Sequence, residues 1–575
     1  MLSSEQEKEA GLPPAAPKDG EPPADTIPTS SDEKATATAQ NQGNTTLEMV
    51  YPSGLKLALL MTSTFISMFL VALDRLIVST AIPQITNEFT SAGDIGWYGT
   101  AYLLTSCAFQ LVFGKLYTVF AVKTVFLGSI VLFEVGSAVC GAAPNSIAFI
   151  FGRAIAGVGP GGISAGIIVI ITYAVPLQQR PQYQGFFGAV FGVSSVLGPL
   201  VGGAFTTNVT WRWCFYLNLP FGGAVILFVF LLLHIPERPE TKVPLKEKLR
   251  QLNAIGLVFL LPGVVCLCLA LQWGGTIYAW SEGRIIALLV LAFALLIGFA
   301  LVQIWKPTQA TVPPPIISQR SIASGFLVSS CVGSHMMLIV YYLPIWFQAI
   351  KGDSAVSSGI HILPMVIPLV VASIVTGILV SRIGYYTPFM IFGVCLTAVG
   401  AGLFTTFDAT ATSKGKWIGY QILYGFGIGT SAQAPNMAAQ TVLPRVDVAI
   451  GASVMFFGQQ LFGSVFTTVG QNVLDNQLAN RLASIVPGIN PKLIQGSGAT
   501  ELLQHIPPSS YAAALVAYND SLRVCFRVAL IMACLSIPCA LAMEWRSVKK
   551  KPQPPNDGGD GARAAEEGKQ EKASA

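Results

Sequence analysis

Long apolar stretches alternate with short polar connectors along most of the 575-residue chain. A helix needs roughly 20 residues to cross about 30 Å of hydrocarbon, and fourteen stretches reach that length. We expect spans at 54–82, 95–114, 124–143, 147–174, 183–206, 214–235, 252–272, 284–305, 322–348, 359–380, 388–407, 417–438, 449–471 and 523–543. Continuously apolar runs lack the alternation of a membrane barrel. The predicted class is therefore an all-α polytopic membrane protein.

Two parts of the membrane body carry chemically marked residues at similar spacing. The matched pairs are Asp74 with His335, Gly114 with Gly377, and Arg153 with Gln421. Such a duplication predicts two six-helix bundles that rock around a central site, with two inserted helices between them. The predicted domains are a disordered cytosolic tail (1–50), an N-terminal six-helix bundle (51–235), a linker with two extra transmembrane helices (236–321), a C-terminal six-helix bundle (322–544) with an exterior loop (472–522), and a disordered cytosolic C-terminal tail (545–575).

Composition and charge support a bilayer environment. Hydrophobic residues make up 52% of the chain and charged residues only 11%, against about 25% charged residues in soluble proteins. Lys and Arg gather on alternate connectors, so the positive-inside rule predicts that both termini are cytoplasmic. The net charge of +5 is small, and the basic clusters flank membrane ends without interleaved aromatic residues. We therefore expect the lipid bilayer as the surrounding partner, no nucleic acid, and a monomer.

Cysteine and histidine usage gives no sign of a metal or of an enzyme. Nearly all of the ten cysteines fall inside apolar runs, and the four histidines are scattered without ligand spacing. No Gly-x4-Gly-Lys-Ser/Thr loop is present for nucleotide binding. We expect no metal, no cofactor and no catalytic residues.

Ionisable residues inside apolar spans are the sharpest chemical signal. A charge at the centre of a membrane costs at least about 2.5 kcal/mol unless it is paired or hydrated. Asp74, Glu134 and Arg153 are the candidates for proton coupling. Two alternatives stay open: Asp74 and Arg75 could form an interfacial ion pair, and Arg153 could bond to carbonyl groups. The sequence does not decide whether Asp74 or Glu134 carries the proton.

Several ordered motifs resemble one family. They are the segment from Leu73 to Pro83, Gly114-Lys115-Leu116 with Lys123, the glycine-rich segment from Arg153 to Gly162, the glycine motif at 188–203, and the segment from Trp211 to Pro220. Together they resemble the fourteen-span drug:proton antiporters of the major facilitator superfamily, most closely fungal toxin and multidrug efflux pumps. The resemblance covers nearly the whole membrane body. It implies the major facilitator fold and a proton gradient as the energy source.

The fifth span carries the motif that, by this resemblance, marks exporters. Its members are Gly188, Gly192, Gly198, Pro199, Gly202 and Gly203. Small residues let a neighbouring helix approach closely, and Pro199 is expected to bend the helix. Ordinary small-residue packing is the alternative interpretation.

Two connectors are interpreted as gating loops. Their marked residues are Gly114, Lys115, Lys123, Gly377 and Arg382. The first loop departs from the superfamily pattern, because Tyr117 and Thr118 stand where an acidic residue is expected. The alternative is that both loops are plain positively charged anchors.

Aromatic and amide residues in later spans are candidates for substrate binding. They are His335, Tyr341, Tyr342, Trp346, Gln421, Gln433, Asn436, Gln459 and Gln460. Such a lining suits large, weakly polar, neutral or cationic molecules. The aromatic residues could instead serve helix packing. Sequons at Asn208 and Asn519 fall on the expected exterior side and are predicted glycosylation sites.

These features predict a secondary active transporter in the plasma membrane. It would export hydrophobic or amphipathic small molecules, such as toxins, drugs and secondary metabolites, in exchange for protons by alternating access. The alternative is a proton-coupled importer or a vacuolar-membrane carrier of siderophores or basic amino acids. A channel is less favoured because matched positions of the two halves carry unequal polar residues.

Overall fold

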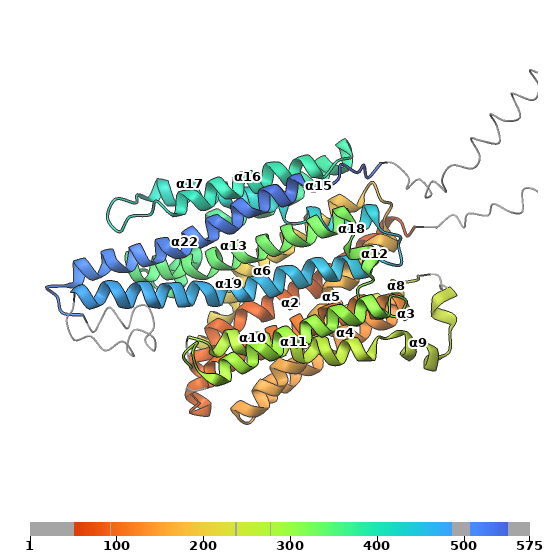
Figure 1. Cartoon of the computed structure of the whole chain (residues 1–575), viewed down its shortest axis with the longest axis horizontal. Helices are drawn as coiled ribbons and strands as arrows, with labels where there is room; N and C mark the ends of the chain where they lie inside the picture. Colours follow the sequence, from red (N-terminus) through yellow and green to blue (C-terminus); the bar gives the residue numbers. More distant parts are fainter. Residues whose placement is uncertain (1–50, 92–93, 236–238, 276–277, 486–505, 550–575) are drawn as a thin grey trace, which may run out of the picture. The chain divides into compact units, whose positions relative to one another are not determined.

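A computed structural model describes residues 51–91, 94–235, 239–275, 278–485 and 506–549. Helices dominate these residues (Figure 1). Within them the only β structure is a pair of isolated bridges, between Gly274 and Tyr278 and between Tyr385 and Ser547. The predicted tails lie outside the described residues, except for 545–549.

The helices are α2 (Gly54–Phe89), α3 (Ile95–Val119), α4 (Val122–Ala142), α5 (Ser146–Ala174), α6 (Arg180–Asn208), α7 (Trp213–Tyr216), α8 (Asn218–Leu232), the 3₁₀ turn η2 (Pro239–Lys242), α9 (Leu245–Gln251), α10 (Ala254–Trp273), α11 (Gly283–Trp305), α12 (Pro314–Ile317), α13 (Arg320–Lys351), α14 (Ala355–Ile360), α15 (Leu363–Ile383), α16 (Thr387–Phe404), α17 (Lys414–Ser431), α18 (Ala434–Val442), α19 (Val448–Ile485) and α22 (Tyr511–Leu541).

Each predicted span overlaps one or two helices. Twelve helical segments of the described chain are long and apolar enough to cross a membrane. The spans predicted at 95–114 and 417–438 correspond to α3 and to α17 with α18, which are not in that set. The all-α membrane class is confirmed, whereas the number of fourteen stays a prediction.

Local sequence explains where key helices begin and end. The Asn145 side chain accepts a hydrogen bond of 2.9 Å from the Ala148 amide, which caps the start of α5. Gly384 ends α15 with a φ of 99°, a backbone conformation that favours glycine. Its amide donates to the Val380 carbonyl, and its carbonyl accepts from the Val548 amide. This second bond fixes the last described residues beside α15.

Both ends of the described chain lie at one end of the helix bundle. Arg445, just before α19, donates to the Tyr51 hydroxyl over 3.1 Å, and Lys549 contacts the Arg382 carbonyl. We call this the terminal end, which lies on the right in Figure 1. The opposite end, where α19 finishes and α22 begins, is the far end.

The N-terminal half (α2–α8) and the C-terminal half (α13–α22) meet closely near the terminal end. There α6 packs against α15 and α3 packs against α19. A Cβ atom on Gly377 would overlap the Pro181 carbonyl oxygen, and one on Gly114 would lie 2.7 Å from the Ser453 hydroxyl. Both glycines belong to the repeat recognised in the sequence. The two halves are therefore closed against each other at the terminal end.

The segment predicted as an exterior loop at 472–522 is largely helical where it is described. Helix α19 continues to Ile485 and α22 begins at Tyr511. Leu474, Leu478 and Leu482 are buried at four-residue spacing, in one cluster with Ala514 and Tyr518 of α22. The prediction was wrong because this stripe extends the helix pair beyond the bilayer. The 38 residues of α19 span about 57 Å, well beyond the hydrocarbon thickness. Residues 486–505 lie outside the described chain.

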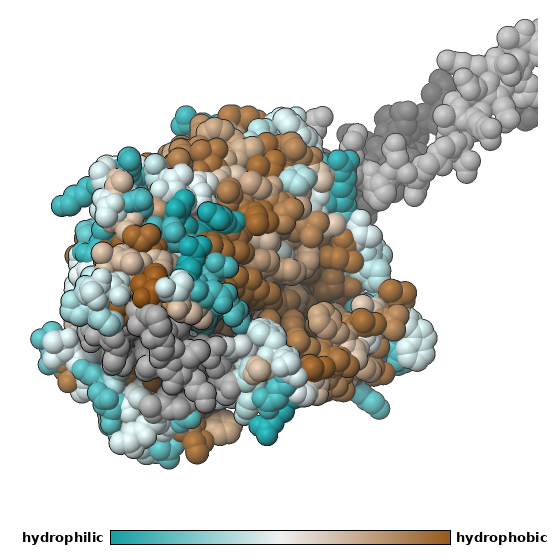
Figure 2. All heavy atoms as spheres, turned by 60° about the vertical axis from the view of Figure 1, so that its left-hand side comes forward, coloured by the Kyte–Doolittle hydropathy of each residue, from teal (hydrophilic) through white to brown (hydrophobic). Residues whose placement is uncertain are grey.

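Much of the outer surface is apolar, as a lipid environment requires (Figure 2). Helix α11 exposes Val290, Phe293, Ile297, Leu301 and Ile304. Its partner α10 packs against both α3 and α19, so the inserted pair contacts one helix of each half.

Candidate functional site

A cavity lies between the two halves of the helix bundle. It encloses about 100 Å³, below the roughly 300–1,000 Å³ of most sites for drug-sized ligands, so a large molecule needs the halves to separate further. Its lining residues are Met68, Val71, Ala72, Arg75, Tyr102, Leu103, Ser106, Pro160, Ser164, Phe187, Gly188, Phe191, Met336, Met337, Leu369, Ser373, Ile428, Gly429, Ala432, Gln433, Phe456, Gln459 and Gln460.

Three of the amides expected to bind substrate line this cavity: Gln433, Gln459 and Gln460. Gln460 joins the halves, because its oxygen accepts from the Ser106 hydroxyl over 3.0 Å and its nitrogen donates to the Gln110 oxygen over 3.1 Å. The cavity therefore has polar groups on an otherwise apolar wall. Substrate binding by these amides stays a prediction.

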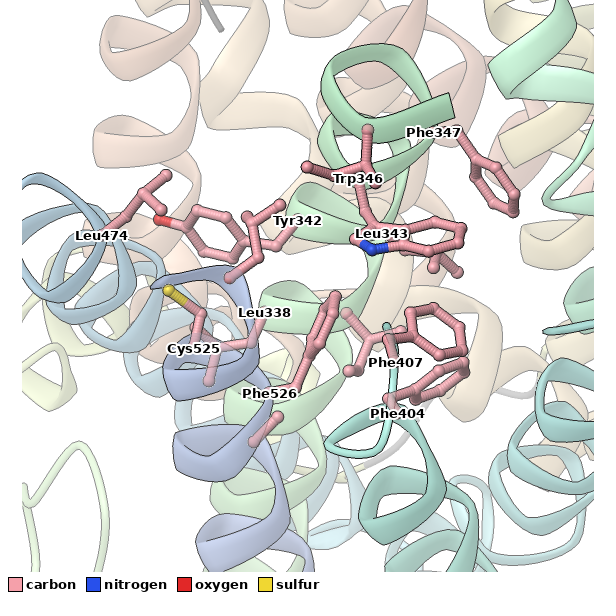
Figure 3. Packing of buried hydrophobic residues seen from close by; sticks show 14 of the residues in the cluster. Leu338, Tyr342, Leu343, Trp346, Phe347, Phe404, Phe407, Leu474, Cys525 and Phe526 are labelled. Carbon is pink, nitrogen blue, oxygen red and sulfur yellow. The ribbon is translucent and has the colours of Figure 1, made fainter. Parts of the chain in front are cut away.

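The other candidate binding residues lie outside the cavity lining. Tyr342 and Trp346 are fully buried in an aromatic cluster of the C-terminal half (Figure 3). Trp346 packs on Phe407 with ring centroids 4.4 Å apart and donates to the Asn519 oxygen over 2.8 Å. Tyr342 donates to the Thr467 carbonyl. In this structure the two aromatic residues hold helices together and do not line the cavity, so substrate binding by them stays a prediction.

The remaining four candidates also face elsewhere. His335 is buried against α17, where its Nδ1 lies 2.8 Å from the Tyr424 hydroxyl. Tyr341 is 49% exposed on the surface of α13. Gln421 and Asn436 are buried outside the lining, and the Gln421 amide has no hydrogen-bond partner within the described chain.

Asp74 and Arg153 form a buried ion pair beside the cavity. Arg153 Nη1 lies 2.6 Å from Asp74 Oδ2, and the side chains are only 1% and 0% exposed. The Arg153 Nε donates to the Tyr98 carbonyl over 3.0 Å. The sequence therefore identified two residues that the fold brings together from α2 and α5. The alternative partner of Asp74, the adjacent Arg75, is not in contact through an ion pair.

Further polar groups surround this pair. The Asn218 amide lies 3.5 Å from Asp74 Oδ1 and donates to the Ser137 hydroxyl over 3.1 Å. Glu134, one turn before Ser137 on α4, is 8% exposed, and neither carboxylate oxygen has a hydrogen-bond partner in the described part of the chain. A Cβ atom on Gly222 would overlap the Glu134 carboxyl group. Glu134 is thus packed between α4 and α8, and no described residue forms an ion pair with it.

Tyr102 connects the buried pair to the cavity. The Arg153 guanidinium stacks on the Tyr102 ring at 4.3 Å, and Tyr102 also lines the cavity. Its hydroxyl donates to the Val71 carbonyl over 3.3 Å. Sequence reasoning missed Tyr102, although its aromatic side chain inside α3 was a usable signal.

The sequence suggested Arg75 only as an interfacial ion-pair partner, yet it is the one charged residue among the described residues that line the cavity. Its Nη2 lies 3.6 Å from Met337 Sδ, a weak acceptor. Among the described residues no carboxylate lies within ion-pair distance of Arg75.

The glycine motif of α6 serves close packing on two neighbours. A Cβ atom on Gly188 would lie 3.0 Å from the Ser373 hydroxyl of α15 and 3.2 Å from the side chain of Gln433, and one on Gly192 would lie 2.8 Å from Val370 of α15. Gly198 and Gly202 face α2, where Cβ atoms on them would overlap Leu76 and Thr80. A Cβ on Gly203 would meet nothing within 4 Å, so this glycine has no packing role in the described structure. Pro199 lies inside one continuous helix.

The gating-loop candidates have different surroundings. Lys115 lies near Asp447 of the other half; burial raises the pKa of Asp447, and Lys115 opposes that effect. Lys123 Nζ instead donates to the Phe230 carbonyl of α8 over 2.5 Å. The Arg382 side chain is exposed, and its carbonyl accepts from Lys549.

The two predicted glycosylation sites are not equivalent. Asn208 is exposed at the end of α6. Asn519 is 2% exposed; its oxygen accepts from Trp346 and its nitrogen donates to the Phe407 carbonyl over 3.0 Å. An oligosaccharide has no room on that nitrogen, so the structure argues against modification at Asn519.

The described residues contain no group of three or more His, Cys, Asp or Glu side chains that could hold a metal ion.

Comparison with known proteins agrees with this architecture. The family model described as Major Facilitator Superfamily matches residues 64–467. An MFS-type transporter of Claviceps purpurea is 52% identical over 505 residues, covering 88% of this chain and 87% of the relative. The MFS-type efflux pump MFS1 of Arthroderma benhamiae is 51% identical over 519 residues, covering 90% and 96%.

Among solved structures, the proton:xylose symporter XylE bound to 6-bromo-6-deoxy-D-glucose matches with a TM-score of 0.54 at 15% identity, covering 84% of this chain and 94% of XylE. This likeness shows the fold alone. The family match and the relatives confirm the resemblance to the major facilitator superfamily, whereas fourteen spans and proton antiport stay predictions. The chain therefore belongs to the major facilitator superfamily and is a transporter rather than an enzyme.

Proposed function

We propose that the protein exports hydrophobic or amphipathic small molecules in exchange for protons. The observation that carries this proposal is the buried Asp74–Arg153 ion pair, which contacts the cavity through Tyr102. A proton that neutralises Asp74 removes the attraction to Arg153 and frees the guanidinium to change partners. Because the guanidinium stacks on a cavity residue, this change reaches the substrate site directly.

Glu134 is the second candidate for proton uptake. Its buried carboxyl group has no hydrogen-bond partner among the described residues, and an uncompensated charge in such a place is costly. A proton would remove that cost. Asp74 and Glu134 then act as two proton sites, and Asn218 bonds both to Asp74 and to Ser137, which lies one turn from Glu134 on α4.

The direction and location belong to the same proposal. The terminal end carries Lys115, Arg180 and Arg445, which favours a cytoplasmic orientation of this end by the positive-inside rule. The halves are closed at that end, as an exporter would be when it releases cargo to the outside. The name of the Arthroderma relative, an efflux pump, supports export. We place the protein in the plasma membrane.

A carrier of basic amino acids has less support. No Asp or Glu lines the cavity among the described residues, whereas Arg75 does. A cationic amino acid would meet a like charge there.

The test is transport in sealed inside-out membrane vesicles with the wild-type chain or Asp74→Asn. Export in exchange for protons predicts that fluorescent hydrophobic compounds accumulate inside vesicles with an acidic lumen, and that a protonophore abolishes this accumulation. Uptake that ignores the protonophore, or proton-driven movement in the opposite direction, would refute the proposal. Immunostaining of intact and permeabilised cells with tags on both termini tests the orientation and the membrane.

A further inference from the structure

The charge balance of the cavity is one-sided. Among the described residues that line it, Arg75 is the only ionised side chain, and the neighbouring carboxylate, Asp74, is already paired with Arg153. The remaining polar groups of the wall are hydroxyls and amides, including Ser106, Gln433 and Gln460. The wall therefore offers a full positive charge without a fixed counter-charge among the described residues.

A guanidinium without a protein partner depends on water or on a ligand. The contact of Arg75 with the Met337 sulfur supplies only a weak acceptor. An apolar neutral substrate would displace water from the cavity and leave the guanidinium unpaired, which is unfavourable in a low-dielectric site. A carboxylate would replace that water with a charge-assisted, two-pronged hydrogen bond.

The rest of the wall indicates the body of the ligand. Met68, Met336 and Met337 are flexible and polarisable, and Phe187, Phe191 and Phe456 offer aromatic surfaces. This combination accepts varied apolar and aromatic shapes. One fixed charge and an adaptable apolar wall together define an amphipathic site.

We propose that the cavity selects amphipathic organic anions, with an apolar or aromatic body and one carboxylate or acidic hydroxyl group that pairs with Arg75. The proposal names the cargo class of the export function above and rests on it. It replaces the neutral or cationic cargo expected from the sequence. Export of an anion against entry of a proton moves net positive charge inward, so an inside-negative membrane potential would assist it.

The test is equilibrium binding to the full chain in lipid nanodiscs, with empty nanodiscs as the blank. Three probes share a pyrene body: pyrenebutyric acid, its methyl ester, and a trimethylammonium analogue. We expect the wild-type chain to bind the acid at least about tenfold more tightly than the ester. Arg75→Gln should lower the affinity for the acid to that for the ester and leave the affinity for the ester unchanged. Arg75→Lys should retain part of the preference for the acid.

Arg284→Gln is the matched control, since Arg284 is 69% exposed outside the cavity lining and should leave all three affinities unchanged. Equal affinity for acid and ester, tighter binding of the cation, absence of binding by all three probes, or equal losses for acid and ester in Arg75→Gln would each overturn the proposal. Size-exclusion profiles establish that the variants are folded. If Arg75→Gln does not fold, the loss of preference for the acid is measured in Arg75→Lys instead. Binding needs no proton gradient, so a failure here leaves coupled export standing, and a failure of coupling in vesicles leaves the anion preference intact.

Discussion

The ring of Tyr102 lies against the guanidinium of Arg153, with 4.3 Å between the ring centroid and the central carbon. The same ring lines the cavity between the halves. A buried ion pair and a substrate site thus share one side chain. Coupling between protonation and binding needs no long pathway in this arrangement.

The first prediction concerns Asp74. Asp74→Asn leaves Arg153 buried without a counter-charge, and breaking a buried pair in this way costs about 3–5 kcal/mol. We expect the unfolding temperature to fall and proton-driven export to drop at least about thirtyfold, while substrate exchange without a gradient persists. Transport and exchange assays in vesicles measure both quantities.

Glu88→Gln is the control for Asp74→Asn. Glu88 lies on the same helix and also pairs with an arginine, Arg212 at 2.7 Å, but its side chain is 47% exposed. We expect this variant to export normally. Undiminished proton-driven export by Asp74→Asn would contradict the role given to the buried pair.

The second prediction separates the Tyr102 ring from its hydroxyl. Tyr102→Phe loses only the 3.3 Å hydrogen bond to Val71, so coupling should remain within about twofold of the wild type. Tyr102→Leu loses the cation–π contact, worth about 0.5–2 kcal/mol, and should reduce the ratio of protons to substrate. Simultaneous measurement of proton and substrate flux in both variants shows whether the ring or the hydroxyl group of Tyr102 is needed for coupling. Equal coupling in both variants would show that the ring is not the link.

The third prediction uses two adjacent glycines of α8. A Cβ atom on Gly222 would overlap Glu134, whereas one on Gly223 would meet nothing within 4 Å. Gly222→Ala should displace the Glu134 carboxyl group and reduce proton-driven export at least about tenfold. Gly223→Ala should be silent, apart from effects of about 1 kcal/mol or less on stability. Export rates normalised to the amount of folded protein test this, and similar rates for both variants would argue against a role for Glu134.

The fourth prediction concerns pH at the far end. The indole of Trp211 donates to Glu88 over 2.6 Å, and this bond, with the neighbouring Arg212, lowers the pKa of Glu88 below its usual value of 4.5. A lowered native-state pKa stabilises the fold above the unfolded-state pKa, and the effect is lost as the pH falls through the native value. The wild type should unfold at a higher temperature than Glu88→Gln near neutral pH. That difference should vanish well below pH 4.5, and a difference that does not depend on pH would refute this assignment.

The fifth prediction concerns the sequons. Asn208 is exposed, whereas Asn519 is buried between Trp346 and Phe407. Any mobility shift that a glycosidase removes should disappear in Asn208→Gln and persist in Asn519→Gln. The latter variant should instead lose thermal stability. Loss of the shift only in Asn519→Gln would contradict the buried placement.

The sequence was informative where a physical constraint acts on one helix at a time. Membrane thickness determines the length of apolar runs, which is why each predicted span meets a helix. Charges are costly in lipid, which is why Asp74 and Arg153 stood out before their contact was known. The extension of α19 was missed because its leucines at 474, 478 and 482 lie among polar residues, and a hydropathy average does not register such a stripe.

The cavity was less predictable because it depends on which faces of different helices meet. Consecutive helical residues differ in direction by about 100°, so Asp74 and Arg75 must face different neighbours, and the sequence alone does not say which one meets the cavity. The same ambiguity affects Trp346, since an aromatic residue fills a packed core as well as a binding site. Only the arrangement of neighbouring helices separates these cases.

Beside the cavity, Gln460 bonds across the two halves through one amide, to Ser106 and Gln110, which lie one turn apart on the opposing helix. Water can satisfy each of these groups as well as its present partner does. The two halves can therefore separate here without leaving any of these three polar side chains without a hydrogen-bond partner. The free-energy cost of breaking this contact is small.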